Sequence, residues 1–361
     1  VLMSLYAGDT VSLTVTREGA KEPLTFKATL TEKLVPFESG FLGILPVREA
    51  QNQTTTGVGV RYVIPDSAAE KAGVKAKDRI LEFNQQKVTS AEMLAFLVNH
   101  LRPEDQASLL ISRDEKPVKL DVKLQKTPDA VPAEIPTQAI PSRTAQENKT
   151  QKIKVGHYKE KLPGSDSSYW AYVPENYHPD YEYGLMVWIH PPGNTMESTI
   201  FNEWKSICEQ RGIIIVGPAA EDVIRWNRDE TEFVEAVVKS MQQRYDIDPT
   251  RIFLLSHADV ADFAFDLAFK YRELFRGVAV TEGSLKSRPP ETDPDYPLSL
   301  YFALNAHNPL NQLLQPRLDL IREMNYPTVF QLIKNDQQPG EYPEKPFLEE
   351  IGRWADSLDR I

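Results

Sequence analysis

The sequence is poor in cysteine, has no excess of basic residues and contains no long apolar run. Its one cysteine, Cys208, excludes an internal disulfide and a cysteine-based metal cluster, and we expect a buried thiol and no metal or cofactor. The 41 basic and 52 acidic residues give a net charge of −11, which disfavours a nucleic-acid partner. No apolar stretch approaches the roughly 20 residues of a transmembrane helix, and we expect no membrane span and no targeting segment within this chain.

With 361 residues, 41% of them hydrophobic, the chain is long enough for two or three domains. An internal repeat offset by 96 positions aligns residues 13–17 with residues 109–113, and both copies continue through a charged turn into a second alternating strand. The second copy closes a unit that begins near residue 35, whereas the first has too few residues for the same core. We therefore predict that residues 1–34 are the C-terminal part of a preceding domain of the same kind. The alternative is a chance likeness of two short hairpins.

A strand edge whose N–H and C=O groups are unpaired readily forms hydrogen bonds with another strand. We therefore expect residues 1–34 to self-associate with a neighbouring chain, to pack on the following domain, or to be poorly ordered.

Residues 35–127 contain a loop, a short helix ending at Gly73, and a helix over residues 90–101 with Thr89 or Ser90 as its cap. This segment resembles a PDZ domain in the arrangement of HtrA-type serine proteases, which implies a small β-sandwich or barrel with two helices. We refer to it as the PDZ-like module. The residues that carry the resemblance are 41–44, 65–69, Gly73, 78–81 and 101–103.

The loop Phe41, Leu42, Gly43 and Ile44 is similar to the carboxylate-binding loop of that family. The resemblance implies that its backbone N–H groups bind the terminal carboxylate of a partner protein, or an extended peptide. The peptide would add a strand beside Ile44 and rest on helix 90–101, with Ala95, to within one residue, facing the groove. The alternative is that Phe41 and Ile44 are core residues only and that residues 45–47 distort the accepting edge.

A proline-rich linker is predicted over residues 128–152, followed by an α/β domain over residues 153–361. The predicted fold is a doubly wound, mostly parallel sheet, because apolar strands alternate with amphipathic helices. The expected strands cover residues 185–190, 212–217, 251–255, 277–281, 299–305 and 328–334. Residues 245–254 resemble the segment that leads to the nucleophile strand in α/β-hydrolases, closest to feruloyl-esterase or polyester-depolymerase members.

The chemistry of that family is absent from the matching positions. Its Gly-x-Ser-x-Gly elbow carries a nucleophilic serine, whereas this sequence has Ala258 there, and Val260 predicts a relaxed turn. Asn308 stands at the position of the catalytic acid. No histidine follows the last predicted strand, since His307 is the last in the chain. His190 begins the oxyanion loop, where two prolines remove N–H donors.

These substitutions predict that Ala258, Asn308 and His190 are vestigial positions of a non-catalytic hydrolase-like domain. By resemblance, the chain belongs to a larger, HtrA-type, bacterial extracytoplasmic or periplasmic protein whose protease domain lies upstream of Val1. Two alternatives stay open: a serine esterase with a non-standard site, and a purely structural scaffold.

Overall fold

The computed structural model describes residues 5–16, 23–32, 35–48, 56–141, 153–162, 167–222, 224–334 and 336–361. It divides into two compact units, residues 1–36 and 37–361. The first unit is an antiparallel hairpin of β1 (Thr10–Val15) and β2 (Leu24–Thr29), in which Leu13 and Phe26 pair and remain exposed. Arg17, residue 34 and residues 142–152, which belong to the predicted repeat, domain boundary and linker, lie outside the described residues.

The PDZ-like module is a strand-rich unit with two short helices, as the resemblance implied. Hydrogen bonds order its larger sheet β4-β5-β6-β8-β9, with β7 beside β6, while β3 pairs with β10. Its elements are β3 (Gly40–Phe41), β4 (Ile44–Pro46), β5 (Val58–Val63), α1 (Ala68–Ala72), β6 (Arg79–Phe83), β7 (Gln86–Lys87), α2 (Ala91–Asn99), β8 (Gln106–Arg113), β9 (Lys116–Lys123) and β10 (Gln125–Lys126).

Side-chain caps fix the two helices of this module. Ser67 accepts a hydrogen bond from the Glu70 N–H at the start of α1, and Gly73 ends that helix with φ of 85°. Ser90, rather than Thr89, caps α2 by accepting from the Met93 N–H at 3.2 Å. The cap therefore fixes the residue at which α2 begins.

The α/β domain is built on one eight-stranded sheet in the order β11-β12-β14-β13-β15-β16-β17-β18. β12 pairs antiparallel with both its neighbours, and all pairs from β14 to β18 are parallel, so the predicted doubly wound, mostly parallel sheet is confirmed. The strands are β11 (Gly156–Lys161), β12 (Ser168–Val173), β13 (Tyr183–Ile189), β14 (Ile213–Pro218), β15 (Ile247–His257), β16 (Gly277–Thr281), β17 (Ser299–Asn305) and β18 (Thr328–Ile333).

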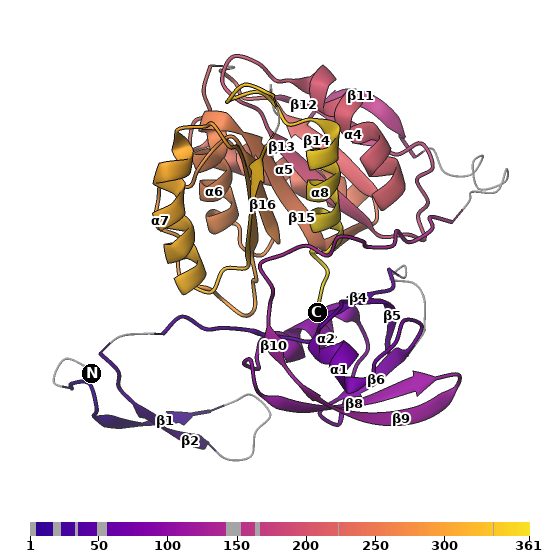
Figure 1. Cartoon of the computed structure of the whole chain (residues 1–361), viewed down its shortest axis with the longest axis vertical. Helices are drawn as coiled ribbons and strands as arrows, with labels where there is room; N and C mark the ends of the chain where they lie inside the picture. Colours follow the sequence, from indigo (N-terminus) through magenta and orange to yellow (C-terminus); the bar gives the residue numbers. More distant parts are fainter. Residues whose placement is uncertain are drawn as a thin grey trace. The chain divides into compact units, whose positions relative to one another are not determined.

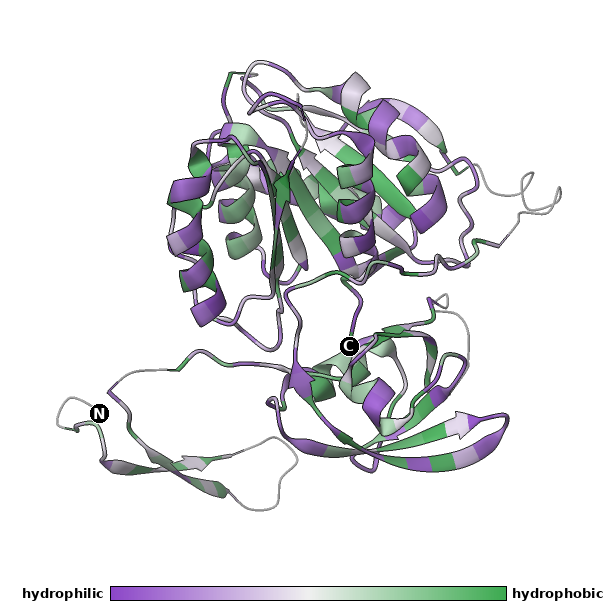
Figure 2. Cartoon of the chain, in the orientation of Figure 1, coloured by the Kyte–Doolittle hydropathy of each residue, from purple (hydrophilic) through white to green (hydrophobic). Residues whose placement is uncertain are grey.

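Helices cover both faces of this sheet (Figure 1). α4 (Glu197–Arg211) and α8 (Lys345–Asp356) pack on one face, whereas α5 (Glu230–Arg244), α6 (Ala261–Lys270) and α7 (Leu310–Glu323) pack on the other. Because both faces are covered, the central strands are continuously apolar, which Figure 2 shows as green ribbons inside purple and white helices.

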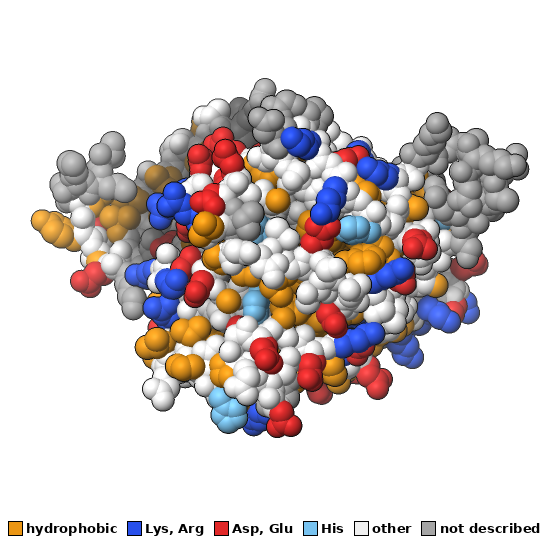
Figure 3. Space-filling model, turned by 90° about the horizontal axis from the view of Figure 1, so that it is seen from above, with side chains coloured by type: hydrophobic (Ala, Val, Ile, Leu, Met, Phe, Trp, Pro, Cys, Tyr) orange, Lys and Arg blue, Asp and Glu red, His pale blue; other side chains and the backbone are white. Residues whose placement is uncertain are grey.

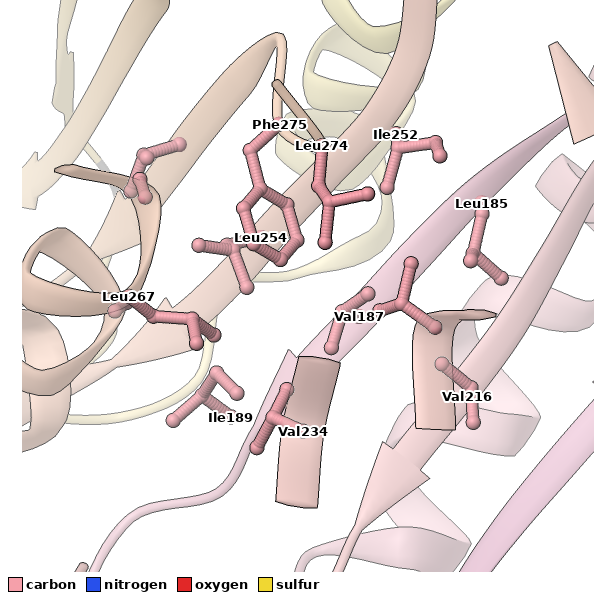
Figure 4. Close-up of a cluster of buried hydrophobic side chains, with 14 of the residues drawn as sticks. Leu185, Val187, Ile189, Val216, Val234, Ile252, Leu254, Leu267, Leu274 and Phe275 are labelled. Atoms are coloured by element: carbon pink, nitrogen blue, oxygen red, sulfur yellow. The ribbon is translucent and has the colours of Figure 1, made fainter. Parts of the chain in front are cut away.

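Figure 4 shows part of the core between the sheet and α5 and α6, where Leu185, Val187, Leu254 and Phe275 are fully buried. On the second face, Cys208 is buried as predicted, and burial raises the pKa of its thiol. The thiol is therefore a packing group rather than a nucleophile.

Acidic and basic side chains are interspersed over the face seen in Figure 3, without a field of one sign. Among the described residues, no helix combines the length and the apolar character needed to cross a bilayer.

Candidate functional site

The loop between β3 and β4 holds the last residue of the 361-residue chain. The N–H groups of Gly43 and Ile44 donate to the main-chain carboxyl oxygen of Ile361 at 2.7 and 3.3 Å, and the Ile361 N–H donates to the Ile44 carbonyl at 3.0 Å. Residues 44 and 361 thus exchange both hydrogen bonds, which is the pattern of an antiparallel strand pair. An extended chain end lies on β4, at the edge where the sequence predicts a peptide.

The side chain of Ile361 fills an apolar pocket of the module. It is 2% exposed and belongs to the same buried cluster as Leu42, Ile44, Leu94 and Val98. Leu94 and Val98 lie on α2, so one helix and one loop together form the pocket wall. A chain end with a large aliphatic side chain therefore fits this pocket by burial as well as by hydrogen bonding.

Ala95 and Phe41, two of the predicted groove residues, line a cavity of about 550 Å³ beside Ile361. α2 borders the cavity on the module's side, and residues such as Arg276 and Tyr296 border it on the side of the α/β domain. Phe41 and Leu42 are buried, whereas Ala95 is half-buried. Four of the five predicted residues therefore form the loop that holds Ile361, and Ala95 lines the cavity beside it.

Gly43 is required in this loop for a reason that the sequence did not indicate. Its φ is 92°, and a Cβ placed there would lie 2.1 Å from Ser67 Cβ. The space that glycine leaves is therefore filled by the cap residue of α1, not by the carboxyl group of a ligand. A bulky side chain at position 43 would therefore collide with Ser67 of the α1 cap rather than with a bound carboxylate.

A buried ionic cluster lies directly behind the groove. Arg48, two residues after β4, contacts Asp356 at 2.6 Å and Asp359 at 2.9 Å, and all three side chains are at most 2% exposed. Arg211 and Arg251 of the α/β domain also contact Asp356, at 2.8 and 3.5 Å. The cluster ties the module, the end of α8 and the last residues of the chain together.

The protonation states of this cluster follow from its geometry. Burial alone would raise the pKa of Asp356, but the surrounding guanidinium groups, Arg48 foremost, hold it at about 2. Although burial acts in the opposite direction, Asp359 and Asp356 raise the pKa of Arg48 above its ordinary value. The ion pairs therefore stay charged at neutral pH.

The carboxyl ends of the parallel strands meet at one edge of the α/β sheet, which is where such folds place their sites. Ala258 follows β15, His190 follows β13 and Asn308 follows β17, so the three vestigial candidates lie at this edge. Ala258 has φ of 59°. The predicted relaxed turn is wrong: the left-handed backbone of an elbow is present although Val260 replaces the second glycine.

Glu282 occupies the centre of this edge, and sequence reasoning missed it. It follows β16, is 4% exposed, and accepts from Asn308 Nδ2 at 2.7 Å and the Gly340 N–H at 2.9 Å. Its other oxygen accepts from the Asn305 N–H. The signal available in the sequence was its position directly after an apolar strand. Every described hydrogen-bond donor to this carboxylate is a neutral amide.

Two buried histidines at this edge are also engaged. His257 Nε2 donates to the Gly340 carbonyl at 3.1 Å, and its Nδ1 lies 2.9 Å from Thr281 Oγ1. His190 Nε2 accepts from the Ala220 N–H at 3.1 Å. Burial lowers the pKa of both imidazoles. Both rings are therefore neutral at pH 7. No group of three potential metal ligands occurs among the described residues.

Comparison with known proteins agrees with the geometry of the groove that holds Ile361. Residues 40–124 match the PDZ domain family. The probable periplasmic serine endoprotease DegP-like of Marinomonas sp. (strain MWYL1) is 31% identical over 97 residues, which cover 25% of this chain. The chain spans only 20% of that protein's length.

Solved structures give partial matches to both domains. A serine endoprotease from Yersinia pestis matches 25% of this chain and 30% of its own, with 24% identity and a TM-score of 0.22. A ferulic acid esterase matches 58% of this chain and 100% of its own, with 12% identity and a TM-score of 0.45. The chain is multidomain, with a PDZ-like module and a mixed α/β domain.

Proposed function

We propose that the PDZ-like module binds the C-terminal ends of polypeptides and that the α/β domain is a non-catalytic partner domain. The proposal rests on how Ile361 is bound: two backbone N–H groups donate to its carboxyl oxygen, and an apolar pocket holds its side chain. Main-chain bonds of this kind supply affinity, and the pocket supplies specificity.

The wider setting rests on the DegP-like relative. We assign the module to residues 35–127, the linker to residues 128–152 and the α/β domain to residues 153–361. Residues 1–34 would be the tail of a preceding PDZ domain and a surface for self-association, supported by their exposed apolar hairpin. The chain would then be part of an HtrA-related extracytoplasmic protein.

The first test measures binding of chain ends to the isolated module. We expect residues 35–127 to bind the nonapeptide of residues 353–361 in the micromolar range, which corresponds to about −8 kcal/mol at 1 μM. Amidation removes the charge of the terminus but keeps every side chain. Because charge-assisted hydrogen bonds contribute roughly 1.5–3 kcal/mol, affinity should fall about ten- to a hundredfold.

Isothermal titration calorimetry with the free and the amidated peptide measures this difference. A peptide ending in aspartate is the control for the apolar pocket. Equal binding of the free and amidated peptides would show that the loop does not recognise the terminal carboxylate.

The second test addresses the α/β domain. We expect no hydrolysis of short p-nitrophenyl esters above the buffer rate, because Ala258 has no nucleophilic oxygen and Glu282 is bound to amides. Ala258→Ser alone should remain inactive, since His257 is held by Thr281 and Gly340. Loss of a triad member typically costs about 10⁴-fold or more.

The assay compares the full chain with Ala258→Ser and His257→Gln. Turnover in the unmodified chain that disappears in His257→Gln would instead support the alternative of a serine esterase with a non-standard site.

A further inference from the structure

We propose that the C-terminal segment of this chain, residues 358–361, is an intramolecular ligand that closes the peptide groove of the PDZ-like module. The inference rests on the proposed function, since it identifies the occupant of the same groove. If the inference holds, the 361-residue chain can bind a free peptide only after residues 358–361 leave the groove.

Occupation by Ile361 and by a partner's terminus is mutually exclusive. The N–H groups of Gly43 and Ile44 already donate to the Ile361 carboxyl oxygen, and the Ile44 carbonyl already accepts from its N–H. The Ile361 side chain is 2% exposed within the core cluster of the module. A second chain end would need the same donors, the same acceptor and the same pocket, so it can bind only after Ile361 leaves.

The segment is held at a second place, outside the groove. Asp359 pairs with Arg48 through Oδ2, at 2.9 Å from Nε. Arg48 also donates to the Asp356 carbonyl at 2.8 Å, where α8 ends. Arg48 follows β4 by two residues, so the strand that binds Ile361 and the residue that binds Asp359 belong to one short stretch. The ion pair thereby aligns the segment with β4.

The short connection favours the chain's own end over a free peptide. Ile361 lies only five positions after Asp356, the last residue of α8. Short tethers give effective concentrations of about 1 mM. A ligand whose free form binds at about 10 μM would then occupy the groove about 99% of the time and weaken binding of a free peptide about a hundredfold.

The experiment measures binding of a fluorescent nonapeptide of residues 353–361 to the full chain by anisotropy. Ile361→Asp, which places a charge in the apolar pocket, should bind the probe about a hundredfold more tightly than the unmodified chain. Ile361→Val keeps an apolar end and is the matched control, expected to stay within about threefold of the unmodified chain. Asp359→Asn weakens the second attachment alone and should raise affinity about tenfold.

Hydrogen exchange of the Gly43 and Ile44 amides gives a readout that needs no added peptide. We expect both amides to be protected in the unmodified chain and in Ile361→Val, and to exchange faster in Ile361→Asp. Protection in the strands of the module, such as β8, reports whether each variant is folded. Light scattering should give the same mass for the unmodified chain and for Ile361→Asp, because association through residues 1–34 does not involve Ile361.

The outcomes separate the inference from the proposed function. If the unmodified chain binds the probe as tightly as Ile361→Asp and residues 35–127 do, the groove is open and the inference is overturned while the function stands. If neither residues 35–127 nor the Ile361→Asp variant binds the probe, the proposed function fails. Faster exchange of the Gly43 and Ile44 amides in Ile361→Asp would still show that Ile361 occupies the groove in the unmodified chain. A blocked groove in a dimer that Ile361→Asp dissociates would assign the occupant to a second copy and overturn the intramolecular ligand.

Discussion

Replacing Asp356 by asparagine should lower the free energy of unfolding by about 3–5 kcal/mol, because it leaves buried guanidinium groups without their carboxylate. Asp356 is fully buried and contacts Arg48, Arg211 and Arg251 within 3.5 Å. Two buried nitrogens of Arg251, Nε and Nη1, already lack a hydrogen-bond partner among the residues that the structure describes. The loss is therefore that of an uncompensated charge, larger than the net contribution of the ion pairs themselves.

Tryptophan fluorescence during urea unfolding measures this change, since all five tryptophans lie in the α/β domain, from Trp170 to Trp354. Asp319→Asn is the control, because Asp319 forms an exposed pair with Arg322 at 3.9 Å and should cost less than about 0.5 kcal/mol. A loss below about 1 kcal/mol for Asp356→Asn would show that water or rearranged side chains neutralise the cluster.

The effect of Asp356 should also depend on pH in a defined direction. Its pKa is about 2 in the folded chain against an ordinary 3.8, so its contribution is present above pH 3.8 and is lost as pH falls toward 2. The difference between the unmodified chain and Asp356→Asn should therefore narrow across that window and stay constant between pH 5 and 7.

The ionic cluster illustrates which parts of this molecule the sequence could predict. Local patterns were sufficient for six of the eight strands of the α/β sheet, β13 to β18, where apolar runs are continuous, but not for β11 and β12. They were also sufficient for α2, where Ser90 marks the start. Arg48 and Asp356 are 308 positions apart, and no periodicity or spacing relates them. Contacts of that kind follow only from the packing of two domains.

At both candidate sites, the sequence indicated the local features but not those that depend on tertiary structure. The loop at residues 41–44 could be predicted because four consecutive residues resemble the carboxylate-binding loop of PDZ domains, and that resemblance is local in the sequence. Its occupant was not, since Ile361 reaches it through tertiary structure. At the elbow, β-branched Val260 suggested a relaxed turn, yet Ala258 retains φ of 59°, because the surrounding strand and helix determine the backbone there.

Gly43→Ala should destabilise the PDZ-like module by about 3 kcal/mol, well beyond the ordinary cost of alanine at a left-handed position, which is about 1–2 kcal/mol. A Cβ at residue 43 would lie 2.1 Å from Ser67 Cβ and 2.5 Å from its Oγ. Ser67 caps α1 by accepting from the Glu70 N–H. The added methyl group must therefore displace the start of α1, in addition to straining the loop.

Gly73→Ala is the matched control, because Gly73 has a similar φ of 85° and a Cβ there would meet nothing within 4 Å. It should cost only the conformational part, about 1 kcal/mol. Native-state hydrogen exchange of the β8 amides measures both losses within the full chain, since the module has no tryptophan.

A double-mutant cycle then isolates the steric part. Ser67→Gly removes the Cβ that the methyl group introduced by Gly43→Ala would meet, so the double variant should recover at least about 1 kcal/mol relative to the sum of the single losses. Equal losses for Gly43→Ala and Gly73→Ala, with no coupling to Ser67→Gly, would mean that the loop moves away from α1 at little cost. The positions of the two N–H donors would then be set by ligand binding rather than by the packing of Gly43 on Ser67.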